Sequence, residues 1–259
     1  MTPIEALIFA ASIVLVLVSP MTGSFLRCWA DRAAIGQRVS SGRSYCDSCG
    51  QTLAARDLVP ILSWLWNRGK SRCCDKPLRW TLMSAEITAL ILAVWAVLVI
   101  SPPLLLPTLI IAWLLQATAL LAVPAPRQST ILGMILAVFG LLISWYGLLG
   151  DIEEHLLGFA LGLLVAAVAW SGASDPRSKF LQAATLFPPM GALLGVGGMW
   201  MALVIGILAA FAHAVATRAL KREDEPSTAP ATSLAIGLAA GTWLVWLYGT
   251  GFSLNPFLR

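Results

Sequence analysis

The chain has 259 residues, of which 58% are hydrophobic and 12% are charged, and its formal net charge is +4. A soluble domain of this size carries about twice that charged fraction, so the composition excludes an ordinary soluble globular protein. Long segments, such as residues 87–126 and 156–172, contain no Lys, Arg, Asp or Glu. Apolar runs of about 18 residues or more are typical of membrane spans. The sequence therefore predicts an all-α fold, a polytopic membrane helix bundle.

About eight membrane spans are expected along the chain. The first is interpreted as a retained span and not as a secretory signal, because residues 1–5 carry no basic side chain. Residues 180–216 are too long for one span and just long enough for two, and Pro188-Pro189 predicts a kink or break in the first of these. The expected spans cover residues 5–26, 81–100, 104–123, 131–150, 156–172, 180–198, 199–217 and 231–251.

Basic residues predict the orientation of the chain. Loop 27–79 carries ten of the 17 Lys and Arg residues, and with eight spans all of these residues except Arg259 fall on one side. Because cytoplasmic loops are enriched in Lys and Arg, this loop is expected in the cytoplasm and both termini outside it. The same bias explains the positive net charge, so no nucleic-acid partner is expected.

A polar, cysteine-bearing segment interrupts the apolar pattern between the first two spans. All the cysteines lie in or beside this loop, namely Cys28, Cys46, Cys49, Cys73 and Cys74. The cytoplasm keeps thiols reduced, which favours a metal site or reduced thiols over a disulfide. Cys46-x2-Cys49 followed by Gly50 has the spacing and the turn of half a zinc knuckle.

The second half of the knuckle is irregular. Cys74 stands where the second cysteine of a pair is expected, but Ser71 stands in the place of the first, and Cys73 is offset by two positions. Neighbouring side chains diverge, so Cys73 and Cys74 would bind one ion only through a strained turn. Two interpretations remain open: ordinary reduced thiols, or a structural zinc site made by Cys46, Cys49, Cys73 and Cys74.

Residues 57–64 combine one acid and one proline with apolar residues. Such a segment is typical of a short amphipathic stretch on the membrane face, here anchored in the interface by Trp64 and Trp66. The neighbouring basic residues that can contact anionic headgroups are Arg56, Arg68, Lys70, Arg72, Lys76 and Arg79. Membrane lipids are therefore expected partners of the loop.

A series of ordered motifs in this region resembles the prepilin leader peptidase family. The motifs are Gly23-Ser24-Phe25-Leu26, Cys46-x2-Cys49-Gly50, Asp57 with Pro60, Leu62, Ser63 and Trp64, the segment Gly69–Leu78, and Glu86. The resemblance implies an aspartic endopeptidase of the bacterial inner membrane that cleaves the leader of type IV pilin-like precursors, for type IV pilus or type II secretion assembly. It also implies three parts: a first span (1–26), a cytoplasmic cysteine-bearing domain (27–80) and a helix bundle resembling the peptidase domain (81–259).

The family's chemistry needs two aspartates, because two carboxylates that share a proton divide into an acid and a base. Pro124 stands about where the first aspartate is expected, and no acid occurs between Glu86 and Asp151. Asp175 is the candidate for the second, although its position before Pro176 also suits a helix N-cap. A partner for Asp175 would be another acid of the cytoplasmic side, and Glu86 lies at membrane depth, where acids are usually paired or functional.

Two functions therefore remain open: a working peptidase, and a non-catalytic member that binds pilin-like helices in pilus or type II secretion assembly. Some family members also methylate the new N-terminus, but no glycine-rich cofactor loop is visible, and no cofactor-binding residues are expected. His155 and His213 lack the spacing of metal ligands and are interpreted as interface residues and not as ligands. A transporter is disfavoured because the spans hold almost no polar groups.

Overall fold

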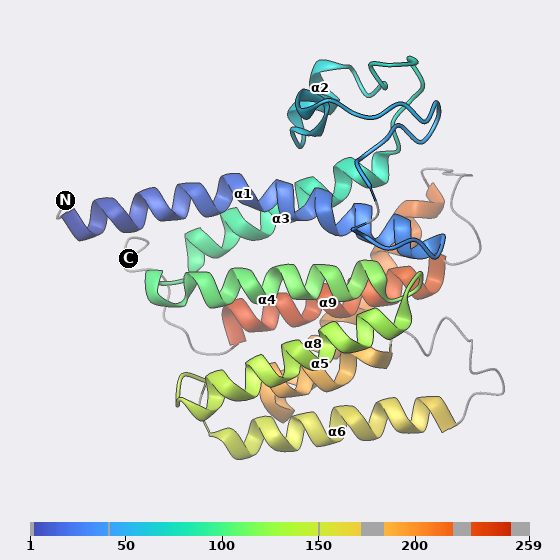
Figure 1. Cartoon of the computed structure of the whole chain (residues 1–259). Helices are drawn as coiled ribbons and strands as arrows, with labels where there is room; N and C mark the ends of the chain where they lie inside the picture. Colours follow the sequence, from blue (N-terminus) through green and yellow to red (C-terminus); the bar gives the residue numbers. More distant parts are fainter. Residues whose placement is uncertain (1–2, 41, 150, 172–183, 220–228, 250–259) are drawn as a thin grey trace. The chain divides into compact units, whose positions relative to one another are not determined.

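A computed structural model describes residues 3–40, 42–149, 151–171, 184–219 and 229–249 (Figure 1). The helices are α1 (Pro3–Ala34), the 3₁₀ helix η1 (Ala55–Leu58), α2 (Leu62–Trp66), α3 (Trp80–Val99), α4 (Pro102–Leu121), α5 (Pro126–Trp145), α6 (Ile152–Ser171), the 3₁₀ helix η2 (Ala184–Leu186), α8 (Phe187–Ala219) and α9 (Ala229–Gly249). Within the described ranges seven helices are long and apolar enough to cross a membrane: α1, α3, α4, α5, α6, α8 and α9. The expected multi-pass helix bundle is confirmed.

The chain forms two compact units. The first comprises residues 1–98 and 102–109, and the second comprises residues 99–101 and 110–259, so that α4 continues from one unit into the other. In the first unit, α1 and α3 pack closely at Gly23, where an added Cβ would lie 2.5 Å from the carbonyl oxygen of Ala85. The cysteine loop connects these two helices and belongs to the same unit.

Several prolines lie at the starts of helices in this chain, whereas Pro20 and Pro107 lie inside α1 and α4. Pro102 and Pro126 begin α4 and α5, and Pro188 and Pro189 lie in the first turn of α8. A proline is tolerated there because the first turn has no intrahelical acceptor for its missing N–H. The kink that Pro188-Pro189 was expected to cause therefore lies elsewhere. It occurs at Gly195, whose φ of 66° is in the region that favours glycine.

The chain reverses direction at Gly195. Phe187 and Leu203 both pack against one buried cluster, which consists of Ala122, Leu186, Ala235 and Leu238. A straight helix would hold Phe187 and Leu203 about 24 Å apart, which is incompatible with packing on one small cluster. Residues 187–216 thus contain two antiparallel segments with the break at Gly195, and the first described segment, 187–194, is shorter than the span expected over residues 180–198.

Close contacts fix the direction of the short segment 187–194. Gly162 lies against Phe187, and Gly158 lies against Gly191, so the segment runs antiparallel to α6. At its end, Gly195 lies beside Glu154 in the first turn of α6. The segment therefore leads to the Asp151 end of the second unit, away from the end where α6 finishes.

The long segment after Gly195 returns through the unit. It packs antiparallel to α9, since Ala202 contacts Gly241 and His213 accepts or donates a 2.9 Å hydrogen bond with Ser233. Arg218, in the last turn of this segment, consequently lies at the same end as Arg127, in the first turn of α5.

Candidate metal centre in the cysteine loop

The first half of the loop forms a tight turn around Cys46. The N–H of Cys46 donates to the carbonyl of Gln51 (2.8 Å), and the N–H of Gly50 donates back to the carbonyl of Cys46 (2.8 Å). Gly50 has a φ of 73°. Tyr45 and Thr52 close the turn as an isolated antiparallel bridge. The backbone thus has the form of a knuckle, with its thiol groups turned to one side.

The second half repeats the first half 25 residues later. The N–H of Ser71 donates to the carbonyl of Lys76 (2.7 Å), and the N–H of Asp75 donates to the carbonyl of Ser71 (2.8 Å). Lys70 and Pro77 form the equivalent bridge. By position in the repeat, Ser71 corresponds to Cys46, Cys74 to Cys49, and Asp75 to Gly50. The expectation that Ser71 takes the place of a cysteine is thus explained by the repeated turn.

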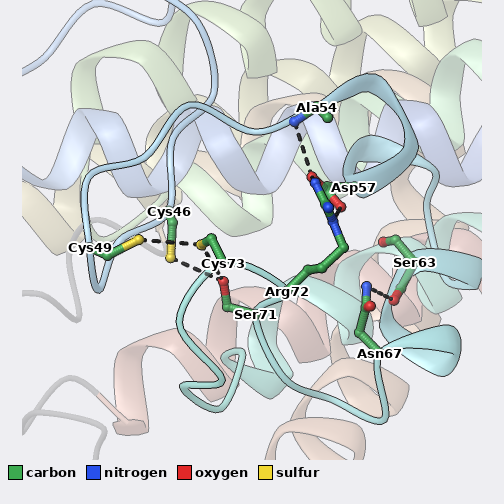
Figure 2. Close-up of polar contacts among 9 residues, drawn as sticks. All are labelled: Cys46, Cys49, Ala54, Asp57, Ser63, Asn67, Ser71, Arg72 and Cys73. Atoms are coloured by element: carbon green, nitrogen blue, oxygen red, sulfur yellow. Dashed lines mark hydrogen bonds and ion pairs between the residues drawn. The ribbon is translucent and has the colours of Figure 1, made fainter.

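The two turns bring four thiols together. The sulfurs of Cys46, Cys49, Cys73 and Cys74 all lie within 4.8 Å of one another. The Sγ–Sγ distance is 3.8 Å between Cys46 and Cys74 and 3.3 Å between Cys49 and Cys73. Figure 2 shows the Cys49 and Cys73 side chains pointing toward one another, with Cys46 beside Ser71. The sulfurs of one tetrahedral ion with metal–sulfur bonds of about 2.3 Å lie about 3.8 Å apart, so the four cysteines lie close enough to bind a metal.

Crowding of the thiols shifts their pKa values in opposite directions. The Ser71 hydroxyl hydrogen-bonds the Cys46 sulfur and, together with the backbone N–H groups of Ser48 and Cys49, lowers the pKa of Cys46 to about 6. The backbone of Gln51 stabilises the Cys49 thiolate, but the adjacent thiols, chiefly Cys73, outweigh it and raise the pKa of Cys49 to about 12. The hydrogen bond from Ser71 therefore favours the Cys46 thiolate, whereas the neighbouring thiols disfavour a Cys49 thiolate, and a bound cation would favour the thiolate form of both.

An ion pair holds the segment before α2 against the second half of the loop. Arg72 donates two hydrogen bonds to the Asp57 carboxylate, from Nε at 2.8 Å and from Nη2 at 3.0 Å (Figure 2). The same carboxylate accepts a 3.0 Å hydrogen bond from the N–H of Ala54, ahead of η1. The hydrogen bond from Arg72 lowers the pKa of Asp57 below its ordinary range. Asp57 therefore joins the segment before α2 to the second half of the loop, and both of its carboxylate oxygens accept hydrogen bonds within the loop.

A second ionic network joins the loop to the helices. Arg79, just before α3, contacts Asp31 of α1 at 3.0 Å and Asp47 of the first knuckle at 2.8 Å. Arg27 also binds Asp31, at 2.8 Å. The buried Arg32 donates to the backbone carbonyl of Val39 as the chain leaves α1. These contacts fix the cysteine loop relative to α1 and α3 within the first unit.

Glu86 supports the loop from inside α3. Its side chain is buried, and one carboxylate oxygen accepts a 2.7 Å hydrogen bond from the N–H of Ile61, the residue preceding α2. Ile61 has a φ of 60°, an unfavourable conformation for a β-branched residue. This contact supports a structural role for Glu86, in place of a role as the carboxylate partner of Asp175.

A cavity of about 450 Å³ lies between the loop and the adjoining parts of α1 and α3. Its wall includes the charged residues Asp31, Arg32, Asp47, Asp57, Lys70, Arg72, Arg79 and Glu86. All of them except Lys70 form the ion pairs or hydrogen bonds given above. The lining is therefore balanced in charge and is largely occupied with holding the loop together.

The expected catalytic positions contrast with this ordered site. Asp175 lies outside the described residues. Pro124 lies in the turn between α4 and α5. The carboxylates in the described part of the second unit belong to Asp151, Glu153 and Glu154, around the start of α6. That is the end opposite Pro124, so no described carboxylate of this unit accompanies Pro124.

The two histidines have structural partners in the second unit. The ring nitrogens of His155 lie 3.0 Å from the carbonyl of Ala192 and 3.2 Å from that of Leu149. His213 is bonded to Ser233, across the contact between α8 and α9. Their interpretation as interface residues is confirmed.

The fold and the thiol cluster define a class: a multi-pass membrane protein with a two-knuckle, thiol-rich loop between its first two apolar helices. Residues 17–100 match the family described as the bacterial peptidase A24 N-terminal domain. No solved structure is significantly similar to the chain.

Curated relatives extend the match beyond that domain. The prepilin leader peptidase/N-methyltransferase of Bacillus subtilis (strain 168) is 28% identical over 249 residues, covering 91% of this chain and 94% of the relative. The proteins of the same name from Dickeya chrysanthemi and Pectobacterium carotovorum subsp. carotovorum are each 26% identical; the matches cover 93% and 83% of this chain, and 92% and 75% of those relatives. The chain thus carries a region similar to the peptidase A24 N-terminal domain and is similar over most of its length to proteins named prepilin leader peptidase/N-methyltransferase.

Proposed function

We propose that this protein is an aspartic endopeptidase that cleaves the leader from type IV pilin-like precursors within the membrane. The observation that supports the proposal most is the similarity to a named leader peptidase over nearly the whole length of both chains. The ordered loop of the first unit adds to it, because this is the region matched by the peptidase-family domain.

In this proposal Asp175 supplies one catalytic carboxylate. Peptide hydrolysis by carboxylates needs one group to take a proton from water and another to protonate or stabilise the carbonyl oxygen. Pro124 removes the expected acid from the turn after α4. The partner of Asp175 is then another acid of the cytoplasmic side, and the Glu223-Asp224-Glu225 run, which lies outside the described residues, is one candidate.

Cleavage of a pilin-like precursor in detergent tests the proposal. Wild type is expected to shorten the precursor, and Asp175→Asn to slow cleavage by about 100-fold or more, since general acid–base groups contribute about that factor or more. The matched control is Asp151→Asn, which changes an exposed acid immediately before α6 and should leave cleavage normal. Mass spectrometry of the new N-terminus reports cleavage and any methylation together. Equal cleavage by wild type and Asp175→Asn would remove Asp175 from the mechanism.

A non-catalytic role is the second candidate, because Pro124 stands about where an acid is expected and no described carboxylate of the second unit lies with it. Such a protein would hold pilin-like helices in pilus or type II secretion assembly. It predicts that wild type and Asp175→Asn co-purify with uncleaved precursor to the same extent and that neither cleaves it. Cleavage by wild type would exclude this candidate.

We also propose that the four cysteines hold a structural zinc ion. The support is their donor type and spacing: thiolates are the preferred ligands of structural zinc, and the sulfurs lie at distances that one tetrahedral ion accommodates. The ion would cross-link the two half-loops and stabilise a fold that has few apolar contacts. Purified wild type should contain one zinc per chain, and removing the zinc with a chelator should unfold the loop and leave the membrane helices intact.

The face of α2 is proposed to contact lipid on the cytoplasmic side of a bacterial inner membrane, with both chain termini on the other side. Leu62, Leu65 and Trp66 are exposed on this helix. Glu86, which binds the residue before α2, is about 9 Å along α3 from its first residue, a depth within the inner leaflet when α3 spans the membrane. A photo-crosslinker replacing Trp66 should give lipid adducts, whereas one replacing Arg43 should not; protein adducts at position 66 would contradict this placement.

A further inference from the structure

The repeat within the cysteine loop makes Ser71 the counterpart of Cys46, and yet Ser71 lies inside the thiol cluster. Its side chain is buried, and its Oγ lies 3.2 Å from the sulfur of Cys46 and 3.0 Å from the sulfur of Cys73. Both separations are hydrogen-bond distances for sulfur. The residue in the first-ligand position of the second knuckle is therefore a hydroxyl that contacts two sulfurs.

We propose that Cys73 supplies the fourth thiolate of the metal site in place of residue 71, and that Ser71 acts as a positioning residue whose single O–H donates to one of the two sulfurs that it contacts, Cys46 or Cys73. This inference rests on the proposed zinc site. It gives the cluster an asymmetric ligand set: positions one and four of the first knuckle, and positions three and four of the second.

The chemistry of the two candidate ligands favours this assignment. A thiolate carries the negative charge that a structural zinc site requires, whereas a serine hydroxyl remains neutral and is a weak ligand. The hydroxyl is instead suited to donate a hydrogen bond to a thiolate, which orients the sulfur and stabilises its charge. Groups of this kind around a metal site typically change its affinity by about 10- to 100-fold.

The backbone of the second knuckle adopts an unfavourable conformation. Cys73 and Cys74 are adjacent, so the second knuckle must turn sharply to direct both sulfurs inward. Asp75, which follows them, has a φ of 55°, where the first knuckle has Gly50 with a φ of 73°. A non-glycine residue is disfavoured in this conformation. The second knuckle thus lacks both the cysteine and the glycine that suit the turn, and we infer that it binds the ion less tightly than a symmetric pair would.

Cobalt(II) binding by the full-length protein in detergent tests the assignment, because its thiolate charge-transfer absorption reports how many sulfurs bind. Cys73→Ala should lose about a quarter of that absorption, one thiolate of four, and bind more than about 100-fold more weakly, beyond the range of outer-sphere effects. Ser71→Ala should keep the full absorption and bind about 10-fold more weakly. The double variant Ser71→Cys/Cys73→Ser should regain four thiolates and bind at least as tightly as wild type.

The outcomes separate this inference from the zinc proposal. If wild type binds no cobalt, both fall together. If wild type binds cobalt and Cys73→Ala matches it in absorption and affinity, the zinc site stands and the role of Cys73 is overturned. Cys28→Ala, which removes a thiol of α1 outside the cluster, is the control for the loss of any cysteine. Retained helical circular dichroism in Cys73→Ala, together with recovery in the double variant, excludes misfolding as the cause of lost binding.

Discussion

The cysteine loop and the second unit differ in how their motif residues are used. In the loop, the residues that the motifs single out contact one another: the four thiols gather, Asp57 binds Arg72, and Glu86 holds the backbone before α2. In the second unit, Pro124 has no carboxylate beside it among the described residues, and the described acids lie at the opposite end. The comparison teaches that the loop motifs form one connected structure, whereas the described residues of the second unit place no carboxylate of that unit at the end where Pro124 lies.

The second unit is held together by close packing of helix backbones. Substitution of a glycine at such a contact is the strongest test of this packing. An added Cβ at Gly191 would lie 2.0 Å from the carbonyl oxygen of Gly158, so α6 and α8 have no room for a side chain there. Gly191→Ala should destabilise this unit by about 1–3 kcal/mol, the usual cost of overpacking. Thermal unfolding in detergent measures the change.

Gly197→Ala is the matched control, because nothing lies within 4 Å of a Cβ added at that position of the same helix. It should leave the stability unchanged or raise it slightly. An equal loss of stability in both variants would show that α6 and α8 do not pack as described.

Glu86 is the residue for which a structural role in the loop and a catalytic role with Asp175 must be distinguished. Glu86→Gln replaces a charged acceptor of the Ile61 N–H with a neutral one and should weaken the loop by about 1 kcal/mol. Hydrogen exchange of the Ile61 amide should speed up accordingly. Cleavage of precursor should fall by less than 10-fold, roughly the effect of a supporting group; complete loss of cleavage would make Glu86 catalytic.

A substitution at Asp75 is expected to stabilise the loop. Asp75→Gly relieves a positive φ of 55° and should stabilise the second knuckle by about 0.5–1 kcal/mol. The reciprocal change, Gly50→Asp, should destabilise the first knuckle, whose φ is 73°. Resistance of the loop to proteolysis compares the two. A loss of resistance in Asp75→Gly would indicate that the Asp75 side chain makes a contact that outweighs the backbone strain.

Acidification should have the smallest effect of the series. Because Arg72 lowers the pKa of Asp57, the carboxylate contributes to stability above its ordinary value of 3.8 and loses that contribution as the pH falls through the lowered pKa. The change is small because the Arg72 side chain is 44% exposed. The rate of hydrogen exchange of the Ala54 amide, corrected for its intrinsic pH dependence, should rise only below pH 3.8. Asp57→Asn should show the faster exchange at every pH.

The family and the membrane-spanning class were decided by local features of the sequence. Long uncharged runs indicate membrane spans because the bilayer core accepts no unpaired charge, and the knuckle follows from Cys46-x2-Cys49-Gly50 because chelation depends on neighbouring residues. The ordered motifs from Gly23 to Glu86 sufficed to indicate the family. The 25-residue repeat was also present in the sequence, but the loss of its cysteine at Ser71 obscured it.

Only the tertiary structure decided where the chain turns and which groups meet. Hydropathy cannot locate a reversal within an uninterrupted apolar run. The break lies at Gly195, where the segment that packs on α6 ends and the segment that packs on α9 begins, and the two prolines lie in a first helical turn. The inward direction of Cys73 and the contact of Glu86 with Ile61 depend on backbone torsions and on residues far apart along the chain. Neither follows from spacing, since a side chain's partners are set by the packing around it.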